Sequence, residues 1–120
     1  MTVQQKEFLA VVRRPDGTAI IDMQGEINAF AETSLNAAYE KAVAGNPSTI
    51  ILNFSNVAYI NSTGIALIVG LLAQSRKAHR RLITCGLSDH YQEIFHVTRL
   101  SDFMTIHADE ASALAEAMVD

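Results

Sequence analysis

Residues Thr49 to Phe54 form a mostly apolar, β-branched run with little alternation between apolar and polar positions. A strand with one face in water alternates between the two kinds of residue, whereas a strand covered on both faces does not. The run therefore predicts a central strand enclosed between two layers. Such strands belong to parallel or mixed sheets.

Strand and helix patterns alternate along the rest of the chain. A hairpin is predicted first, with strands over residues 8–14 and 18–24, a turn at Pro15-Asp16-Gly17, and an end at Gly25. Two further strands are predicted over residues 82–85 and 103–106. The predicted helices cover Asn28 or Thr33 to about Gly45, and then residues 62–79, 89–97 and 109–118. This order predicts one domain over residues 1–120, an α/β sandwich with a mostly parallel central sheet, an edge hairpin and about four helices.

Composition narrows the classes of function. Hydrophobic residues make up 49% of the chain and charged residues 18%, against about 25% charged in an average domain. Part of the surface is therefore expected to meet something other than water. The formal net charge of −4 argues against nucleic acid as a partner, because phosphate backbones require a basic face.

No segment reads as a membrane span or a secretion signal. The densest apolar stretch, Ile65 to Ala73, is far shorter than the roughly 20 residues that a membrane helix needs, and the first seven residues lack an apolar signal core. We therefore expect a cytoplasmic protein. Its single cysteine, Cys85, is expected to be a buried small hydrophobic residue. The four histidines lack the spacing of a zinc site, so no metal and no cofactor are expected.

A predicted polar loop, residues 55–61, leads from the buried strand into a very apolar helix. Asn61, Ser62 and Thr63 suit the start of this helix, because their side-chain oxygens can cap backbone N–H groups. A helix N-terminus also stabilises a phosphate, so a hydroxyl here could be phosphorylated, adding a charge of about −1.5 to −2. The segment matches neither a Gly-x-Ser-x-Gly nucleophile motif nor a Walker loop. Both roles, cap and phosphate acceptor, remain open at this point.

The helix that follows is apolar on more than one side. Ile65, Ile68, Val69 and Leu72 recur at helical spacing and are predicted to form its core stripe. Leu67 and Leu71 lie off that stripe and widen the apolar arc. The second face is a candidate surface for a partner.

The stretch from Val57 to Ile68 resembles the motif of the STAS domain, the family of bacterial anti-sigma factor antagonists, in which Asp-Ser-Ser-Gly opens a helix. Other segments agree in order along nearly the whole chain. Gly25-Glu26-Ile27-Asn28 resembles the family's Gly-Glu-Leu-Asp, Ile51 to Val57 resembles its Leu-Asp-Leu-Ser segment, and Leu87-Ser88, Ile94-Phe95 and Leu100 resemble its late helix.

The resemblance implies a switch protein that is not an enzyme. When unphosphorylated, such a protein binds an anti-sigma factor, which is a serine kinase, and so frees a sigma factor; a phosphatase resets the switch. By position, the phosphorylated residue is Ser62, with Thr63 as the neighbouring hydroxyl. The expected partner-binding residues are Gly25, Glu26, Asn28, Asn61, Ser62, Thr63, Gly64 and Ile65.

The chain departs from the family pattern at three positions, where Asn28, Asn53 and Asn61 replace the usual Asp. Each substitution keeps shape and removes charge, so we expect low charge to be concentrated around the Ser62 loop. Asn61 also leaves an alternative open: a STAS scaffold or accessory subunit of a stressosome or of a lipid or anion transporter, without phosphorylation. A third hypothesis, a nucleotide-binding enzyme, lacks paired catalytic groups near the loop. The sequence leaves the partner, the upstream signal and the oligomeric state undefined.

Overall fold

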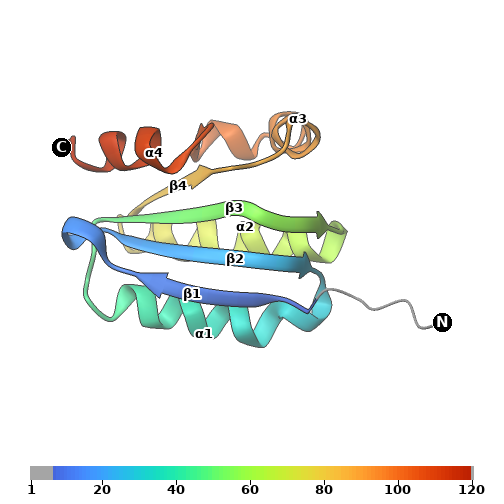
Figure 1. Ribbon diagram of the computed structural model, residues 1–120, viewed down its shortest axis with the longest axis horizontal. Coiled ribbons are helices and arrows are strands. Elements are labelled where there is room, and N and C mark those ends of the chain that lie inside the picture. Colours follow the sequence, from blue (N-terminus) through green and yellow to red (C-terminus); the bar gives the residue numbers. More distant parts are fainter. Residues whose placement is uncertain (1–6, 120) are drawn as a thin grey trace.

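The computed structural model describes residues 7–119 and contains a five-stranded sheet in the order β1-β2-β3-β4-β5 (Figure 1). The strands are β1 (Leu9–Arg13), β2 (Ala19–Ile27), β3 (Thr49–Ile60), β4 (Arg81–Cys85) and β5 (Thr105–His107). β1 and β2 pair as an antiparallel hairpin, and every other neighbouring pair is parallel. The predicted mostly parallel sheet with an edge hairpin is confirmed.

Four α-helices of the described residues cover this sheet: α1 (Glu32–Val43), α2 (Ser62–Lys77), α3 (Asp89–Val97) and α4 (Glu110–Ala117). Two hydrophobic clusters show how they are distributed. The larger contains α1 and α2 residues together with Ile21, Ile50 and Leu52 of the sheet. The smaller contains Ala113 of α4 together with Ile20 and Ile51. Since successive strand residues point to opposite faces, α4 lies on the face opposite α1 and α2, which gives the predicted sandwich.

The two central strands are longer than predicted. β2 does not end at Gly25 but continues to Ile27, and the predicted loop after Phe54 is the second half of β3, which ends at Ile60. Gly25 adopts a φ of 90° at an irregularity in the pairing, a conformation that glycine accepts without steric cost. The two strands then pair again up to Ile27 and Ile60. Gly25, which the sequence pattern predicts as the end of the strand, is therefore the site of a bulge, and the pairing of β2 with β3 continues beyond it.

The predicted core stripe of α2 is partly wrong. Val69 is 44% exposed, whereas Leu71 is only 1% exposed. The buried face of α2 consists of Gly64, Ile68, Leu71, Leu72 and Ser75. Because α2 is apolar on nearly all sides, hydropathy alone does not show which side meets the sheet.

The other element boundaries agree with the predictions to within a few residues. Asn28 caps a short 3-10 turn, Ala29–Ala31, and α1 begins at Glu32. Of the two predicted helix starts, Asn28 therefore marks the start of the turn, and Thr33 lies one residue after the start of α1. β5 begins later than predicted because the N–H groups of Phe103 and Met104 bond back to the Leu100 carbonyl, at the end of a 3-10 turn over Leu100–Asp102. Arg76 and Lys77 lie in the last turn of α2, where cations complement the helix dipole.

Candidate functional site at the start of α2

The carboxyl ends of β2 and β3 lie side by side, and a helical segment begins directly after each (Figure 1). Ile27 and Ile60 are register partners at this end. Asn28 follows the first and Asn61 follows the second. This pairing brings together the two segments predicted to bind a partner, residues 25–28 and 61–65.

Asn61 is the residue that caps α2. Its side-chain Oδ1 accepts a hydrogen bond from the backbone N–H of Gly64 at 2.8 Å, and its carbonyl accepts one from Ile65 N at 2.9 Å. Ser62 and Thr63 therefore occupy the first two helical positions, and both are exposed. The interpretation of Ser62 and Thr63 as caps is wrong, because Asn61, the other candidate, fills this role. The Ser62 hydroxyl is not needed to hold the helix.

Gly64 fixes how closely α2 approaches the end of β2. A Cβ atom at this position would lie 2.1 Å from the carbonyl oxygen of Ile27 and 2.9 Å from Cγ2 of Ile60. The same Ile27 carbonyl accepts a hydrogen bond from Asn61 N at 3.2 Å. The glycine of the motif thus allows the helix to begin against the neighbouring strand, with no room for a side chain.

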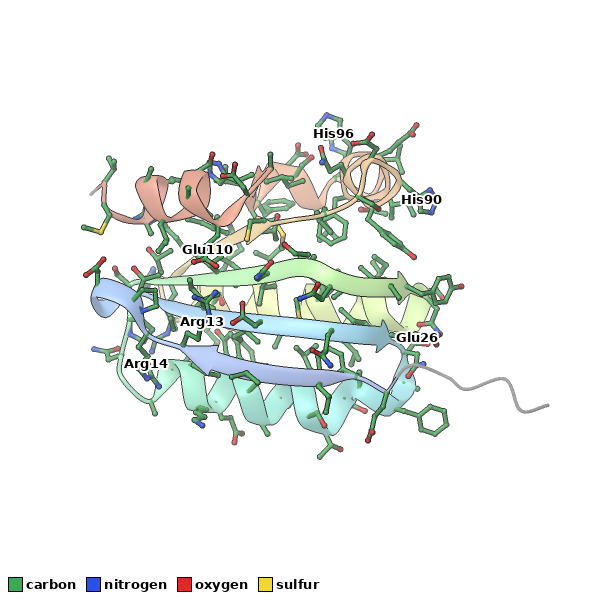
Figure 2. All side chains as sticks on the ribbon, viewed as in Figure 1. Arg13, Arg14, Glu26, His90, His96 and Glu110 are labelled. Atoms are coloured by element: carbon green, nitrogen blue, oxygen red, sulfur yellow. The ribbon has the colours of Figure 1, made fainter. Side chains whose placement is uncertain are left out.

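The start of α2 offers hydrogen-bond donors to an anion. The first N–H groups of a helix have no partner inside it, and the helix dipole adds partial positive charge. Asn61 accepts a hydrogen bond from the N–H of Gly64, and the hydrogen bonds of the described residues include none from the N–H of Ser62 or Thr63. Within the described helix the first turn carries no acidic residue. Glu26 is the nearby carboxylate that Figure 2 shows at this end of the sheet.

Asn53 does not belong to this site. It lies in the first half of β3, eight positions before Asn61, which corresponds to about 26 Å along a strand. Its Nδ2 donates to Asp22 at 2.8 Å, and its Oδ1 accepts from the hydroxyl of Ser55 at 2.7 Å. The expectation that all three Asn substitutions lower the charge around Ser62 is therefore wrong for Asn53. Asn28 and Asn61 alone have that effect.

The surroundings of Asn53 form a separate polar network on the α4 face. Arg13 pairs with Asp22 and with Glu110 of α4, so it connects the hairpin to the last helix. The Arg13 guanidinium, more than the Asn53 amide, lowers the pKa of Asp22. Cys85 contacts Asn53 and is buried, and burial raises the pKa of its thiol to about 11. The predicted buried cysteine is confirmed.

Two exposed aromatic residues flank the site, and neither was predicted from the sequence. Phe30 is 87% exposed in the turn that Asn28 caps, where the Asn28 Oδ1 accepts from Phe30 N at 2.9 Å. Tyr59 is 51% exposed in β3, opposite Glu26. The turn that holds Phe30 contacts both β2 and α2. The sequence contains one signal that could have identified Phe30. This residue lies two positions after Asn28, which caps the turn.

α3 holds the last residue of β3 through a tyrosine. The backbone N–H of Ile60 donates to the Tyr91 hydroxyl at 2.8 Å, and this hydroxyl donates to the Ile60 carbonyl at 3.4 Å. Both residues are buried. Ile60 immediately precedes the cap of α2, so Tyr91 contributes to the position of the Ser62 segment.

Residues 10–113 match the family described as the STAS domain. The chain is 30% identical over 86 residues to the anti-sigma-B factor antagonist of Listeria monocytogenes, covering 72% of this chain and 75% of that protein. This chain belongs to the STAS domain family. The expectation of a regulator rather than an enzyme agrees with the name of this relative.

Solved structures show the same fold. An anti-sigma factor antagonist from Mycobacterium paratuberculosis superposes with a TM-score of 0.81 at 19% identity, covering 92% of this chain and 94% of that one. The anti-sigma factor antagonist SpoIIAA in its unphosphorylated form has a TM-score of 0.70 at 25% identity, covering 95% of this chain and 100% of that one. Its phosphorylated form, from Bacillus, has a TM-score of 0.67 at 26% identity, with 92% and 98% covered.

Across residues 7–119, none of the helices has both the length and the apolar character required to cross a bilayer.

Proposed function

We propose that this STAS domain is a cytoplasmic anti-sigma factor antagonist whose partner binding is switched off by phosphorylation of Ser62. Unphosphorylated, it binds an anti-sigma factor kinase; phosphorylated, it releases that partner until a phosphatase removes the phosphate. The observation that carries the proposal is the division of roles at the start of α2. Asn61 caps the helix, and the neighbouring Ser62 is exposed, so its hydroxyl is accessible to a kinase.

The local backbone is suited to carry the phosphate. A phosphate on Ser62 would lie beside the N–H groups of the first helical turn, where the dipole favours negative charge. The modification therefore leaves the helix intact. It adds a charge of about −1.5 to −2 to a surface whose neighbouring family positions, Asn28 and Asn61, are neutral here. The main effect falls on the partner, which must then meet a dianion.

The proposed binding surface combines the Ser62 segment with residues 25–28 and with the aromatic pair. Phe30 and Tyr59 supply exposed aromatic area on the two segments that meet at the start of α2, and aromatic residues are enriched at interface centres. We expect the partner to cover these rings and to approach the start of α2 closely.

The relatives support this proposal by what their names state. SpoIIAA is an anti-sigma factor antagonist with solved unphosphorylated and phosphorylated forms, and the Listeria relative is named as an antagonist of anti-sigma-B factor. In this chain, Asn61 replaces the Asp that the family motif usually has before the serine. An uncharged cap lowers the repulsion against an incoming phosphoryl group, and it keeps the same hydrogen bond to Gly64 N.

The test incubates the protein with an anti-sigma factor serine kinase and ATP and maps the phosphorylated residue by mass spectrometry. We expect one phosphate on Ser62, loss of labelling in Ser62→Ala, and retained labelling in Ser34→Ala, an exposed serine of α1. Binding of the same kinase is measured by calorimetry, where Ser62→Asp is expected to weaken binding at least tenfold. Unchanged binding of Ser62→Asp together with no phosphate on Ser62 or Thr63 would contradict the switch and favour the scaffold or accessory role.

A further inference from the structure

β1 forms an open edge of the sheet. It pairs with β2 on one side, and no strand among residues 7–119 pairs with its other side (Figure 1). Half of its backbone N–H and C=O groups therefore point outward. Natural edge strands are commonly protected by lysine, proline or a bulge. This strand has the sequence Leu9-Ala-Val-Val-Arg13 and pairs with β2 in unbroken register, so it contains no lysine, proline or bulge. Its one charged residue, Arg13, is held by Asp22 and Glu110.

A groove with a volume of about 360 Å³ runs along this edge. It lies between β1 and α1, and its α1 side carries mainly small residues, which keep it open. The lining residues are Ala10, Val11, Val12, Ser34, Ala37, Ala38 and Lys41. An extended strand that paired with β1 would extend the sheet over this groove.

We propose that the occupant is β1 of a second copy of this chain, paired antiparallel with the first. The two copies would then form a dimer around a twofold axis through Val11, and their two five-stranded sheets would become one continuous sheet. Such an interface uses the same patch on both copies and must be self-complementary. The inference is independent of the proposed phosphorylation switch.

The strand is self-complementary in this register. Val11, which is 60% exposed, faces Val11 of the other copy, and Leu9, which is 49% exposed, faces Arg13 of the other copy. Arg13 does not bring an unpaired charge to the contact, because it is already paired with Asp22 and Glu110. Pairing therefore covers apolar surface without opposing like charges.

The helices below the strands fit the same axis. α1 lies along β1 and contacts both β1 and β2 (Figure 1). Two α1 helices meeting across the twofold axis would contact through Ala37, with Ser34 of one copy near Lys41 of the other. Small residues at this contact allow the approach of roughly 8–10 Å that packed helices need.

The first test measures the mass of the full-length protein in solution by sedimentation velocity over a range of concentrations. We expect a dimer for the natural chain and a monomer for Val11→Lys, which places two ammonium groups opposite each other across the axis. Gln24→Lys is the matched control and is expected to stay dimeric, since Gln24 is exposed on β2 and pairs with Leu9 rather than forming the edge. Thermal unfolding of each variant checks that its fold is intact.

The second test is a cross-link that depends on register. In a Cys85→Ala background, the Val11→Cys variant is expected to form a disulfide between copies under mild oxidation, because the two substituted positions face each other across the axis. Thr33→Cys, exposed on α1, is expected to remain unlinked at the same concentration. A monomeric natural chain at high micromolar concentration overturns the proposal. So does a dimer that Val11→Lys leaves unchanged while the Val11→Cys variant fails to cross-link.

Discussion

Gly64 at the start of α2 lies directly against the backbone carbonyl of Ile27 at the end of β2, so closely that a Cβ on Gly64 would come within 2.1 Å of that oxygen. The same oxygen accepts the N–H of Asn61. One carbonyl therefore positions both the cap of α2 and its first turn. The distance between the Ser62 segment and the β2 end is set by backbone contact, which leaves little freedom for adjustment.

Gly64→Ala is expected to lower the free energy of unfolding by about 2–3 kcal/mol, because the added methyl group must displace either α2 or the end of β2. Urea denaturation measures the change. The control is Gly70→Ala in the same helix, where a Cβ would meet no atom within 4 Å. That substitution is expected to raise stability by about 0.5–1 kcal/mol through helix propensity. Equal effects of the two substitutions would contradict the contact with Ile27.

Asn61→Ala is expected to destabilise the protein by about 1 kcal/mol, because the N–H of Gly64 loses its acceptor. Asn61→Asp keeps the acceptor and adds a negative charge at the helix N-terminus, so a gain of about 0.5 kcal/mol is expected. Asn36→Ala, at an exposed position of α1, is the control and is expected to cause no loss. Thermal unfolding of the four proteins distinguishes these outcomes, and a tolerated Asn61→Ala would show that the cap contributes little.

Tyr91→Phe removes the hydroxyl that bonds to both backbone groups of Ile60. Because these groups are buried, we expect a loss of about 1–3 kcal/mol in the free energy of unfolding. Tyr59→Phe removes the same atom from an exposed ring and is expected to have no measurable effect. Guanidinium denaturation provides the comparison, and similar stabilities for the two variants would argue against the role of Tyr91.

Asp22 predicts a pH dependence of stability. Its pKa is lowered, first by the hydrogen bond from Arg13, from an ordinary value of 3.8. The stabilisation is therefore fully present above pH 3.8 and is lost as the pH falls through the lower pKa of the folded state. Asp22→Asn is expected to cost about 1 kcal/mol at pH 7 and progressively less in acid.

Urea denaturation at several pH values measures this difference between Asp22→Asn and the natural chain. Glu40→Gln, at an exposed position of α1, serves as the control. A stability difference that stays constant from neutral pH to well below the ordinary Asp pKa of 3.8 would show that the Asp22 carboxylate is not stabilised by its charge.

Most of the architecture was predictable because hydrophobic pattern and turn residues agree along this chain. α3 was predicted with the observed bounds, since Ser88 caps it and its buried residues recur at helical spacing. The length of β3 was not predictable in the same way. Its second half contains exposed polar residues such as Ser55 and Asn56. What keeps this half extended is its pairing with β2, a contact distant in sequence.

The candidate site was also predictable only in part. The grouping of Asn28 with the Ser62 segment follows from the meeting of parallel strand ends, which a βαβ order implies. The separation of Asn53 from that group depends on how far β3 continues, and the sequence pattern does not show it. Phe30 was missed because a large aromatic residue ordinarily lies in the core. Here the 3-10 turn after Asn28 shifts the angular position of its side chain.

The unequal pairing of β3 has a consequence for the order in which the protein opens. Up to Asn53 the strand lies between β2 and β4, but beyond it the described β4 partner has ended and the Tyr91 hydroxyl bonds Ile60 from that side. Separating residues 57–60 therefore breaks fewer backbone bonds than separating residues 50–52. Hydrogen exchange is expected to occur at residues 57–60 through a local opening and at residues 50–52 only through global unfolding. A molecule bound at Ser62 would slow the first process and leave the second almost unchanged.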